Sequence, residues 1–111
     1  MNPIPSELRA RLLANGARIA NGEPHDPLPV VRLFTTGKNA SWLLTEIDPD
    51  DQDLAYGLCD LGLGAPRLDY LRLSHLVELA GDELRCDVDF IARQPLSAYL
   101  REAQAAGTIR P

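Results

Sequence analysis

The sequence predicts an α+β protein with a mainly antiparallel sheet of four or five strands, packed against an N-terminal, a short central and a C-terminal helix. Two observations lead to this prediction. Apolar residues recur at helical spacing near both ends of the chain, whereas the middle holds short β-branched, aromatic and leucine-rich runs with brief connections. The length of 111 residues suits a single core, so we expect residues 1–111 to form one domain.

The first segment has the signals of a helix followed by a loop. Ser6 can accept a hydrogen bond at the helix start, two leucines repeat at the i,i+4 spacing, and Asn15-Gly16 offers a left-handed stop. Residues 17–29 are richer in glycine, asparagine and proline. We therefore expect a helix within residues 1–16 and a loop over 17–29.

The sheet and the other two helices are expected within residues 30–107. Four runs are rich in strand-forming or apolar residues, and Gly- or Asp-bearing connections between them favour antiparallel neighbours. These runs are residues 30–35, 41–47, 54–59 and 68–73.

The remainder of the chain alternates between helical and extended patterns. Ser74 and Gly81 are placed to begin and end a short helix. Residues 84–90 alternate apolar and polar side chains, which is typical of a half-buried strand. Pro95 at a first helical position and Gly107 at the end then bound an amphipathic C-terminal helix.

Composition excludes several classes of function. The net charge is -5 and no stretch concentrates Lys or Arg, which argues against nucleic-acid binding by charge. No apolar run is long enough to span a membrane, and the start has no signal-peptide pattern, so we expect a cytoplasmic protein.

Cys59 and Cys86 fit buried thiols, and the Cys and His spacings match no compact zinc site. No phosphate-binding loop or nucleophile elbow is present, so we expect neither a metal nor a cofactor.

A set of residues within the segment from Asp26 to Leu100, about two-thirds of the chain, resembles a known family. It runs from Val31-Arg32-Leu33-Phe34-Thr35 through Trp42, Thr45-Glu46, Asp48, Tyr56-Gly57-Leu58, Tyr70, Leu73-Ser74, Leu79, Asp87 and Phe90 to Pro95-Leu96. In order and spacing this set resembles the bacterial domain-of-unknown-function family 2958. The sequence departs from the family pattern at Arg67, Asp69 and Arg85-Cys86. The resemblance implies an α+β domain in a plasmid- or phage-borne context and brings no activity, substrate or cofactor.

The densest charge cluster is Glu46, Asp48, Asp50, Asp51 and Asp53. Oxygen ligands on a turn suit Ca²⁺ or Mg²⁺, but the glycine and the closing glutamate of an EF-hand loop are missing. A solvated hairpin tip is the competing interpretation and the favoured one.

Three carboxylates are weak candidates for catalysis. Period-2 alternation places Glu46 on the same side as Trp42, where an apolar wall could raise its pKa for general acid chemistry. Asp87 and Asp89 lie two apart on the predicted strand 84–90, a spacing available to paired carboxylates. In each case a structural ion pair or a solvated face is the favoured interpretation.

Two functions from different classes follow. The leading hypothesis is a noncatalytic protein-interaction or accessory module, which binds a protein partner through the aromatic residues Trp42, Tyr56 and Tyr70 with the acidic edge of Asp48, Asp50 and Asp51. The alternative is a small hydrolase or metal-dependent enzyme that uses Glu46 with Asp87 or Asp89. A third hypothesis, mimicry of nucleic acid, requires the carboxylates to be aligned at phosphate-like spacing.

Overall fold

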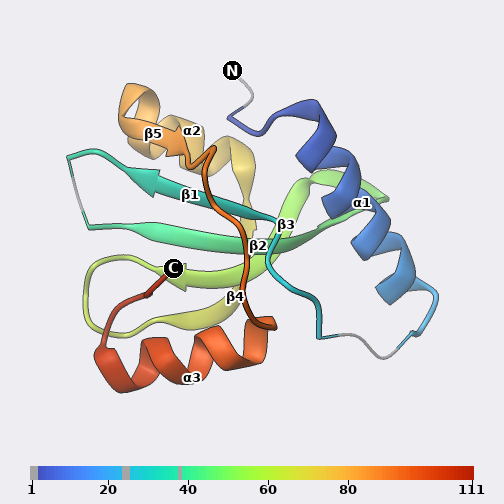
Figure 1. Ribbon diagram of the computed structural model, residues 1–111. Coiled ribbons are helices and arrows are strands. Elements are labelled where there is room, and N and C mark those ends of the chain that lie inside the picture. Colours follow the sequence, from blue (N-terminus) through green and yellow to red (C-terminus); the bar gives the residue numbers. More distant parts are fainter. Residues whose placement is uncertain (1–2, 24–25, 38) are drawn as a thin grey trace.

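The computed structural model describes residues 3–23, 26–37 and 39–111, and over these residues the chain forms a five-stranded antiparallel sheet with helices on both faces (Figure 1). The strand order is β4-β3-β2-β1-β5. This arrangement confirms the predicted α+β class and the predicted order of the N-terminal, central and C-terminal helices. The elements are α1 (Ser6–Ala20), β1 (Val31–Thr35), β2 (Ser41–Asp48), β3 (Asp51–Asp60), β4 (Arg67–Arg72), α2 (Leu73–Ala80), the 3-10 turn η1 (Gly81–Glu83), β5 (Leu84–Cys86) and α3 (Leu96–Ala106).

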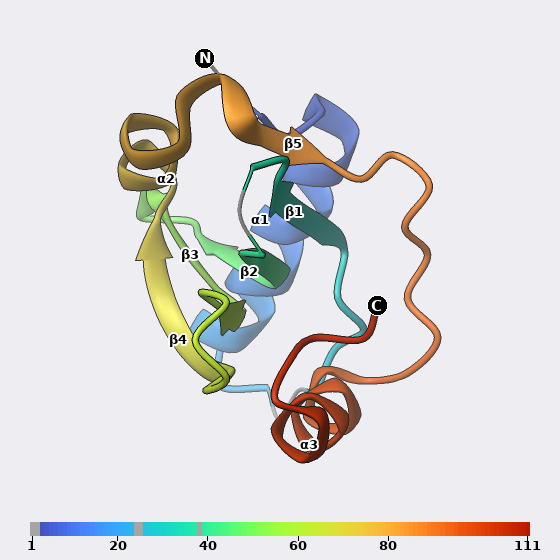
Figure 2. The ribbon, with the colours of Figure 1, turned by 90° about the vertical axis from the view of Figure 1, so that its left-hand side faces the viewer.

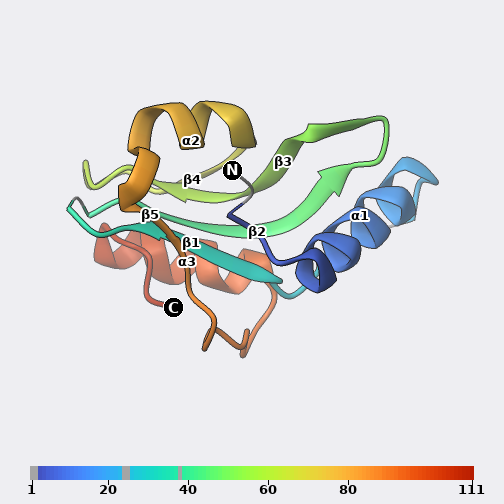
Figure 3. The ribbon, with the colours of Figure 1, turned by 90° about the horizontal axis from the view of Figure 1, so that it is seen from above.

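The central strand β2 is buried on both faces. Trp42 and Leu44 belong to a core cluster that α1 and α2 help to form, whereas Leu43 belongs to a second cluster with α3. Successive side chains of a strand point to opposite faces, so a doubly covered strand needs an uninterrupted apolar run. Accordingly, α2 and α3 lie on opposite sides of the sheet (Figure 3).

The C-terminal helix is held by its own small core. Leu96, Tyr99 and Ala103 on α3 pack with Leu43 and Leu58 of the sheet. The Tyr99 ring is 1% exposed, and burial of a side chain of this kind stabilises the fold by about 1.5–3 kcal/mol. Beyond α3 the chain turns back toward the sheet (Figure 2).

Helix α1 continues to Ala20, so the prediction that it stops at Asn15-Gly16 and gives way to a loop from residue 17 is wrong at this boundary. Asn15 Nδ2 donates to the Thr45 carbonyl oxygen at 2.8 Å. A Cβ atom on Gly16 would stand 1.9 Å from the carbonyl oxygen of Ile47. Gly16 therefore allows the helix to approach the strand closely and does not end it. Residues 24–25 of the predicted loop lie outside the described residues.

This close approach covers a strand edge. β1 pairs with β2 only as far as the Val31–Leu44 pair, although β2 continues to Asp48. Beyond that pair, α1 takes the place beside β2 that a longer β1 would have filled. Cover of this kind satisfies backbone groups and prevents pairing with another chain.

The β2–β3 connection is tighter than predicted. Only Pro49 and Asp50 form the turn, and β3 begins at Asp51, three residues before the expected start at Leu54. Asp51 and Asp53 therefore lie on a strand, where their side chains can reach β4 and α2.

Other element boundaries also differ from the predictions. Ser74 is the second residue of α2 rather than its cap, β5 ends at Cys86 rather than Phe90, and Pro95 precedes the first helical residue of α3. Gly81 and Gly107 end their helices with positive φ angles of 50° and 76°, as predicted. Within the described parts of the chain, no helix has both the length and the apolar character to cross a membrane.

Candidate functional site

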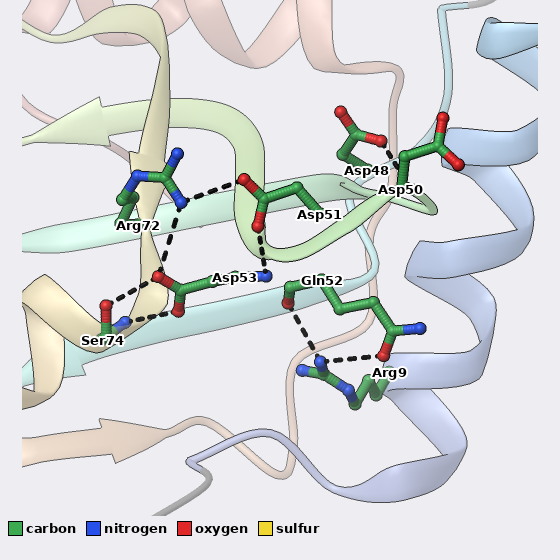
Figure 4. Close-up of polar contacts among 8 residues, drawn as sticks. All are labelled: Arg9, Asp48, Asp50, Asp51, Gln52, Asp53, Arg72 and Ser74. Atoms are coloured by element: carbon green, nitrogen blue, oxygen red, sulfur yellow. Dashed lines mark hydrogen bonds and ion pairs between the residues drawn. The ribbon is translucent and has the colours of Figure 1, made fainter.

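The acidic hairpin divides into a free tip and a bonded base (Figure 4). At the tip, the backbone N–H of Asp50 donates to Asp48 Oδ1 at 2.8 Å, a local turn that needs no ligand. Asp50 is exposed and Asp48 is half-buried. These two carboxylates have no ion pair among the described residues, so their negative charge is available to a partner.

The base of the hairpin is tied to other elements of the fold. Asp51 Oδ2 lies 3.0 Å from Arg72 Nη1, and Asp53 Oδ2 lies 3.8 Å from the same nitrogen (Figure 4). Asp53 also accepts from the Ser74 backbone N–H at 2.9 Å and from the Ser74 hydroxyl at 2.7 Å. Hydrogen bonds from Ser74, followed by the charge of Arg72, lower the pKa of Asp53. Asp51, which the sequence analysis assigned to the binding edge, thus serves as a structural link.

Asp53 stabilises the start of α2 from a neighbouring strand. The first N–H groups of a helix have no partner within the helix, and a carboxylate is favoured there by the helix dipole. On the other side of the hairpin, Arg9 Nη2 donates to the Gln52 carbonyl oxygen at 3.0 Å. Among the described residues, no group of three or more His, Cys, Asp or Glu side chains is placed to hold a metal ion.

Glu46 lies on the opposite face of β2 from the one predicted. The pairing register shifts between Leu44 and Glu46, which inserts Thr45 as an extra residue and turns Glu46 to face Tyr56. Trp42 instead pairs with Cys59 and packs in the cluster on the other face. Strict alternation of side chains along a strand predicts that Glu46 lies beside Trp42, but a bulge between them reverses the face on which Glu46 lies.

The surroundings of Glu46 do raise its pKa. Burial is the main cause and the nearby charge of Asp48 the second. Glu46 lines a small pocket of about 140 Å³ with Asp48, Tyr56 and Tyr70. This volume is well below the roughly 300 Å³ at which small-molecule sites begin.

Asp87 and Asp89 do not share a strand face. β5 ends at Cys86, and the chain then turns so that the Asp89 N–H donates to Asp87 Oδ1 at 3.1 Å. Asp87 Oδ2 also accepts from Arg32 Nη1 at 3.1 Å, an ion pair with both side chains about one-quarter exposed. The spacing predicted for a catalytic pair is therefore wrong.

The weak catalytic candidates consequently lie apart in the sheet. Glu46 is on β2, in the part that extends beyond β1, and faces β3. Asp87 follows β5, the edge strand on the other side of β1. No described hydrogen bond or ion pair links Glu46 to Asp87 or Asp89, and they share none of the pockets described here.

The aromatic candidates separate into a pair of tilted tyrosine rings in contact and a buried indole. The Tyr56 and Tyr70 rings have centroids 4.8 Å apart on adjacent strands. Tyr70 is 60% exposed, whereas Trp42 is 5% exposed. Tyr70, on the edge strand β4, and Trp42 nevertheless line the same groove.

This groove has a volume of about 400 Å³ and lies between the edge of the sheet, α2 and the connection from β3 to β4. Trp42 and Cys59 line it from the sheet and Leu76 from α2, with Leu61 and Leu63 on the connection. Leu61 and Leu63 are 58% and 82% exposed. We call this site the β4 groove; its full lining is Trp42, Cys59, Leu61, Leu63, Ala65, Arg67, Asp69, Tyr70, Leu71 and Leu76.

The two exposed leucines of the β4 groove were missed by the sequence analysis. They stand in Leu61-Gly62-Leu63-Gly64, within the glycine-bearing connection between the predicted strands 54–59 and 68–73. Turn chemistry requires the glycines but not the leucines, and exposed large apolar side chains in a turn are the signal that could have found this surface.

Together, fold and surface define an α+β protein built on one antiparallel sheet, with an apolar groove at one sheet edge and an acidic hairpin at the other end of β2 and β3 from Trp42 and Cys59. The chain belongs to the family described as "Protein of unknown function (DUF2958)", whose model matches residues 3–110. The resemblance noted between residues 26 and 100 is therefore confirmed, and the match extends nearly to both ends of the chain. Comparisons with curated proteins and with solved structures give no match.

Proposed function

We propose that this protein is a noncatalytic interaction module that binds an extended segment of a protein partner at the β4 groove and at the acidic surface around Glu46 and Asp48. The proposed location is the cytoplasm, and the proposed setting is a plasmid- or phage-derived element, which rests on the family resemblance. The observation that carries the proposal is the position of Tyr70. It lines both the β4 groove and the small pocket that contains Glu46 and Asp48.

The groove supplies an apolar contact that the rest of the fold does not need. Leu63 is 82% exposed, so its side chain contributes little to the core in the free protein. Exposed leucine and tyrosine side chains beside a recess are typical of binding surfaces, where a few apolar anchors supply most of the affinity. A partner with one or two large apolar side chains would fit there.

The acidic side defines the charge of the partner. Asp48 and Asp50 have no described ion pair, and Glu46 lies half-buried beside Tyr56. A Lys or Arg several residues along the partner segment from its apolar residues would meet these carboxylates and the aromatic rings of Tyr56 and Tyr70. The proposed partner segment is therefore extended, with apolar residues toward one end and a basic residue toward the other.

The separation of Glu46 from Asp87 and Asp89 favours this function over the hydrolase alternative. A hydrolase that uses two carboxylates needs both within reach of one substrate atom. Here Asp87 is already paired with Arg32, and the pocket at Glu46 is too small for most substrates.

The test uses a random peptide library selected on the wild-type protein, with affinities of the selected peptides then measured by calorimetry. We expect the selected sequences to combine large apolar residues with Lys or Arg. Leu63→Glu and Tyr70→Ala should each weaken binding at least about tenfold, as removal of an interface anchor does. Ile91→Glu is the matched control, since Ile91 is 87% exposed and outside the groove.

Added salt should also weaken binding, because the carboxylates near the hairpin tip are at the surface. If the library yields no peptide whose binding depends on Leu63 or Tyr70, the proposed site is wrong. Selected peptides that lack basic residues and bind independently of salt would contradict the acidic part of the site.

A further inference from the structure

The connection between β3 and β4 borders two different parts of the molecule. Leu61 and Leu63 line the β4 groove, whereas Gly62 and Gly64 line a separate recess of about 490 Å³. Residues 107–109, which we call the segment after α3, line that recess as well. The leucines that the proposed partner would contact are therefore carried on a connection whose backbone borders the segment after α3.

Asp60, the last residue of β3, joins these two pieces of chain. Its Oδ1 accepts from the Gly62 N–H at 2.9 Å, at the residue that separates the two groove leucines. Its Oδ2 accepts from the Thr108 hydroxyl at 2.9 Å and from the Ile109 N–H at 3.0 Å. One carboxylate thus holds the connection with one oxygen and the segment after α3 with the other.

Burial makes the two sets of hydrogen bonds to Asp60 depend on each other. Asp60 is 1% exposed. Burial of a carboxylate is costly unless hydrogen bonds replace the water that it loses. If Thr108 and Ile109 moved away, Oδ2 would need water in their place, and the surrounding chain would have to open to admit it. Release of the segment after α3 therefore also loosens the connection.

The segment after α3 has an anchor of its own. Ile109 is 7% exposed and packs in the cluster that contains Leu43, Leu58 and Tyr99. Thr108 beside it is exposed, and its hydroxyl donates to Asp60. Thr108 can therefore be changed without removing a core side chain.

The connection itself has little to fix its conformation. Gly62 and Gly64 have φ angles of 78° and 81°, and glycine loses more backbone freedom on ordering than other residues. Leu61 and Leu63 are 58% and 82% exposed, so the core does not hold their side chains. The end of α3 lies close to the connection, because a Cβ atom on Gly107 would stand 3.9 Å from the Gly64 carbonyl oxygen.

We propose that the segment after α3 controls the shape of the β4 groove, with Asp60 as the positioning residue between them. The inference rests on the proposed function, because it concerns regulation of the surface at which the partner would bind. While residues 108–109 are docked, Asp60 holds Gly62 and keeps Leu61 and Leu63 in place beside the groove. When they are released, the groove loses part of its wall. By linkage, a partner segment that binds the ordered groove also stabilises the docked state.

The first experiment measures amide hydrogen exchange by NMR in the free protein and needs no partner. Thr108→Val removes the hydroxyl that donates to Asp60, whereas Thr108→Ser retains it. We expect Thr108→Val to speed exchange of both the Gly62 and the Ile109 amides about fivefold, the factor that corresponds to one hydrogen bond. In Thr108→Ser both amides should exchange at wild-type rates.

The order of the groove leucines is measured separately, because a general loss of stability would not change it in the folded protein. Methyl order parameters of Leu61 and Leu63 should fall in Thr108→Val and recover in Thr108→Ser. The Leu79 methyls are the internal control, since Leu79 is 81% exposed but outside the β4 groove. Thr36→Val is the matched variant at another exposed threonine, and it should leave the exchange rates and order parameters unchanged.

Asp60→Asn tests the positioning residue directly. Asparagine has one acceptor oxygen, so it cannot accept from both Gly62 and Ile109. We expect at least one of these amides to exchange faster than in Thr108→Val and neither to keep its wild-type rate. Because Thr108 is exposed, the Thr108 variants decide the question even if Asp60→Asn fails to fold.

The second experiment connects the segment after α3 to binding, with a library peptide whose affinity depends on Leu63. Thr108→Val should weaken this peptide by up to about fivefold, because the apparent Kd rises as the binding-competent fraction falls. In the wild type, the bound peptide should slow exchange of the Ile109 amide, although Ile109 does not line the β4 groove. If the library yields no such peptide, the proposed function fails, and the first experiment still decides whether the connection and the segment are coupled.

Two results would overturn the coupling. One is a Thr108→Val variant with faster exchange at Ile109 but wild-type exchange at Gly62 and wild-type methyl order at Leu63. The connection would then be held by its contact with Asn39, whose carbonyl oxygen lies 3.2 Å from a Cβ atom built on Gly62. The other is a Thr108→Ser variant that behaves like Thr108→Val, because the hydroxyl would then not be the group responsible.

Discussion

Replacement of Gly16 by alanine tests the contact between α1 and β2. In an isolated helix this change would be stabilising by about 1 kcal/mol, because glycine has more backbone freedom to lose. In this fold the added Cβ would stand 1.9 Å from the Ile47 carbonyl oxygen, and real Cβ contacts are essentially never below 3.0 Å. The helix must therefore move away from β2 by at least about 1.1 Å.

That movement affects two stabilising interactions. The hydrogen bond from Asn15 to Thr45, 2.8 Å long, is adjacent to the clash and contributes about 1 kcal/mol. Leu12 and Ile47, both fully buried, lose close packing when the helix shifts. Overpacking of this kind costs about 1–3 kcal/mol. After the gain in helix propensity, we expect Gly16→Ala to lower the free energy of unfolding by about 1–3 kcal/mol.

The assay is thermal unfolding followed by circular dichroism. The expected loss corresponds to a Tm lower by about 4–12 °C for a domain of this size. Ala14→Gly is the control, because Ala14 is an exposed residue of the same helix. This change should lower the free energy of unfolding by about 1 kcal/mol, through helix propensity alone. If Gly16→Ala raises the Tm by about as much as Ala14→Gly lowers it, helix propensity alone governs Gly16 and the steric argument is refuted.

Three further predictions concern titratable groups. Hydrogen bonds from Ser74 lower the pKa of Asp53, so its stabilising effect is present above 3.8, its usual value, and is lost as the pH falls through the folded pKa. The Tm difference between wild type and Asp53→Asn should therefore be largest near neutral pH and should disappear as the pH falls below 3.8. A Tm difference that is independent of pH would contradict the role of the charge. Burial raises the pKa of Glu46 above 4.5, so stability present below that pH is lost as the pH rises through the folded pKa. Glu46→Gln should accordingly raise the Tm at neutral pH but not below pH 4.5, and a lower Tm at neutral pH would show that the carboxylate is needed. Burial raises the pKa of the Cys59 thiol from 9.0 to about 11, which makes its thiolate fraction about a hundredfold smaller. Iodoacetamide should therefore modify Cys86 before Cys59 in the native protein, as mass spectrometry of the products can show, and equal rates would argue against the burial of Cys59.

Local signals in the sequence were sufficient for the class of fold. The apolar run of β2, the Gly-bearing connection before it and the helix stops at Gly81 and Gly107 are all found in the structure. Such features depend on neighbours within a few residues, since backbone preferences and side-chain alternation act over that range. The family resemblance rested on the same kind of ordered residue pattern.

The candidate site depended on contacts that local patterns do not encode. The extra residue at Thr45 turned Glu46 to the other face of β2, and the early end of β5 placed Asp87 beside Arg32. Whether a hairpin carboxylate is free or bonded also depends on distant residues, as the link from Asp53 to Ser74 shows.

The sequence by itself determined that the chain forms an α+β fold of mainly antiparallel strands, because that information lies in periodicity and turn residues. Only the tertiary structure decided that Gly16 lies within a helix and that Leu63 borders a groove. Both depend on which strand edges and faces remain uncovered once the sheet is assembled. A bulge, a short strand or a close helix contact changes the exposed surface of the protein while leaving most of the local sequence pattern intact.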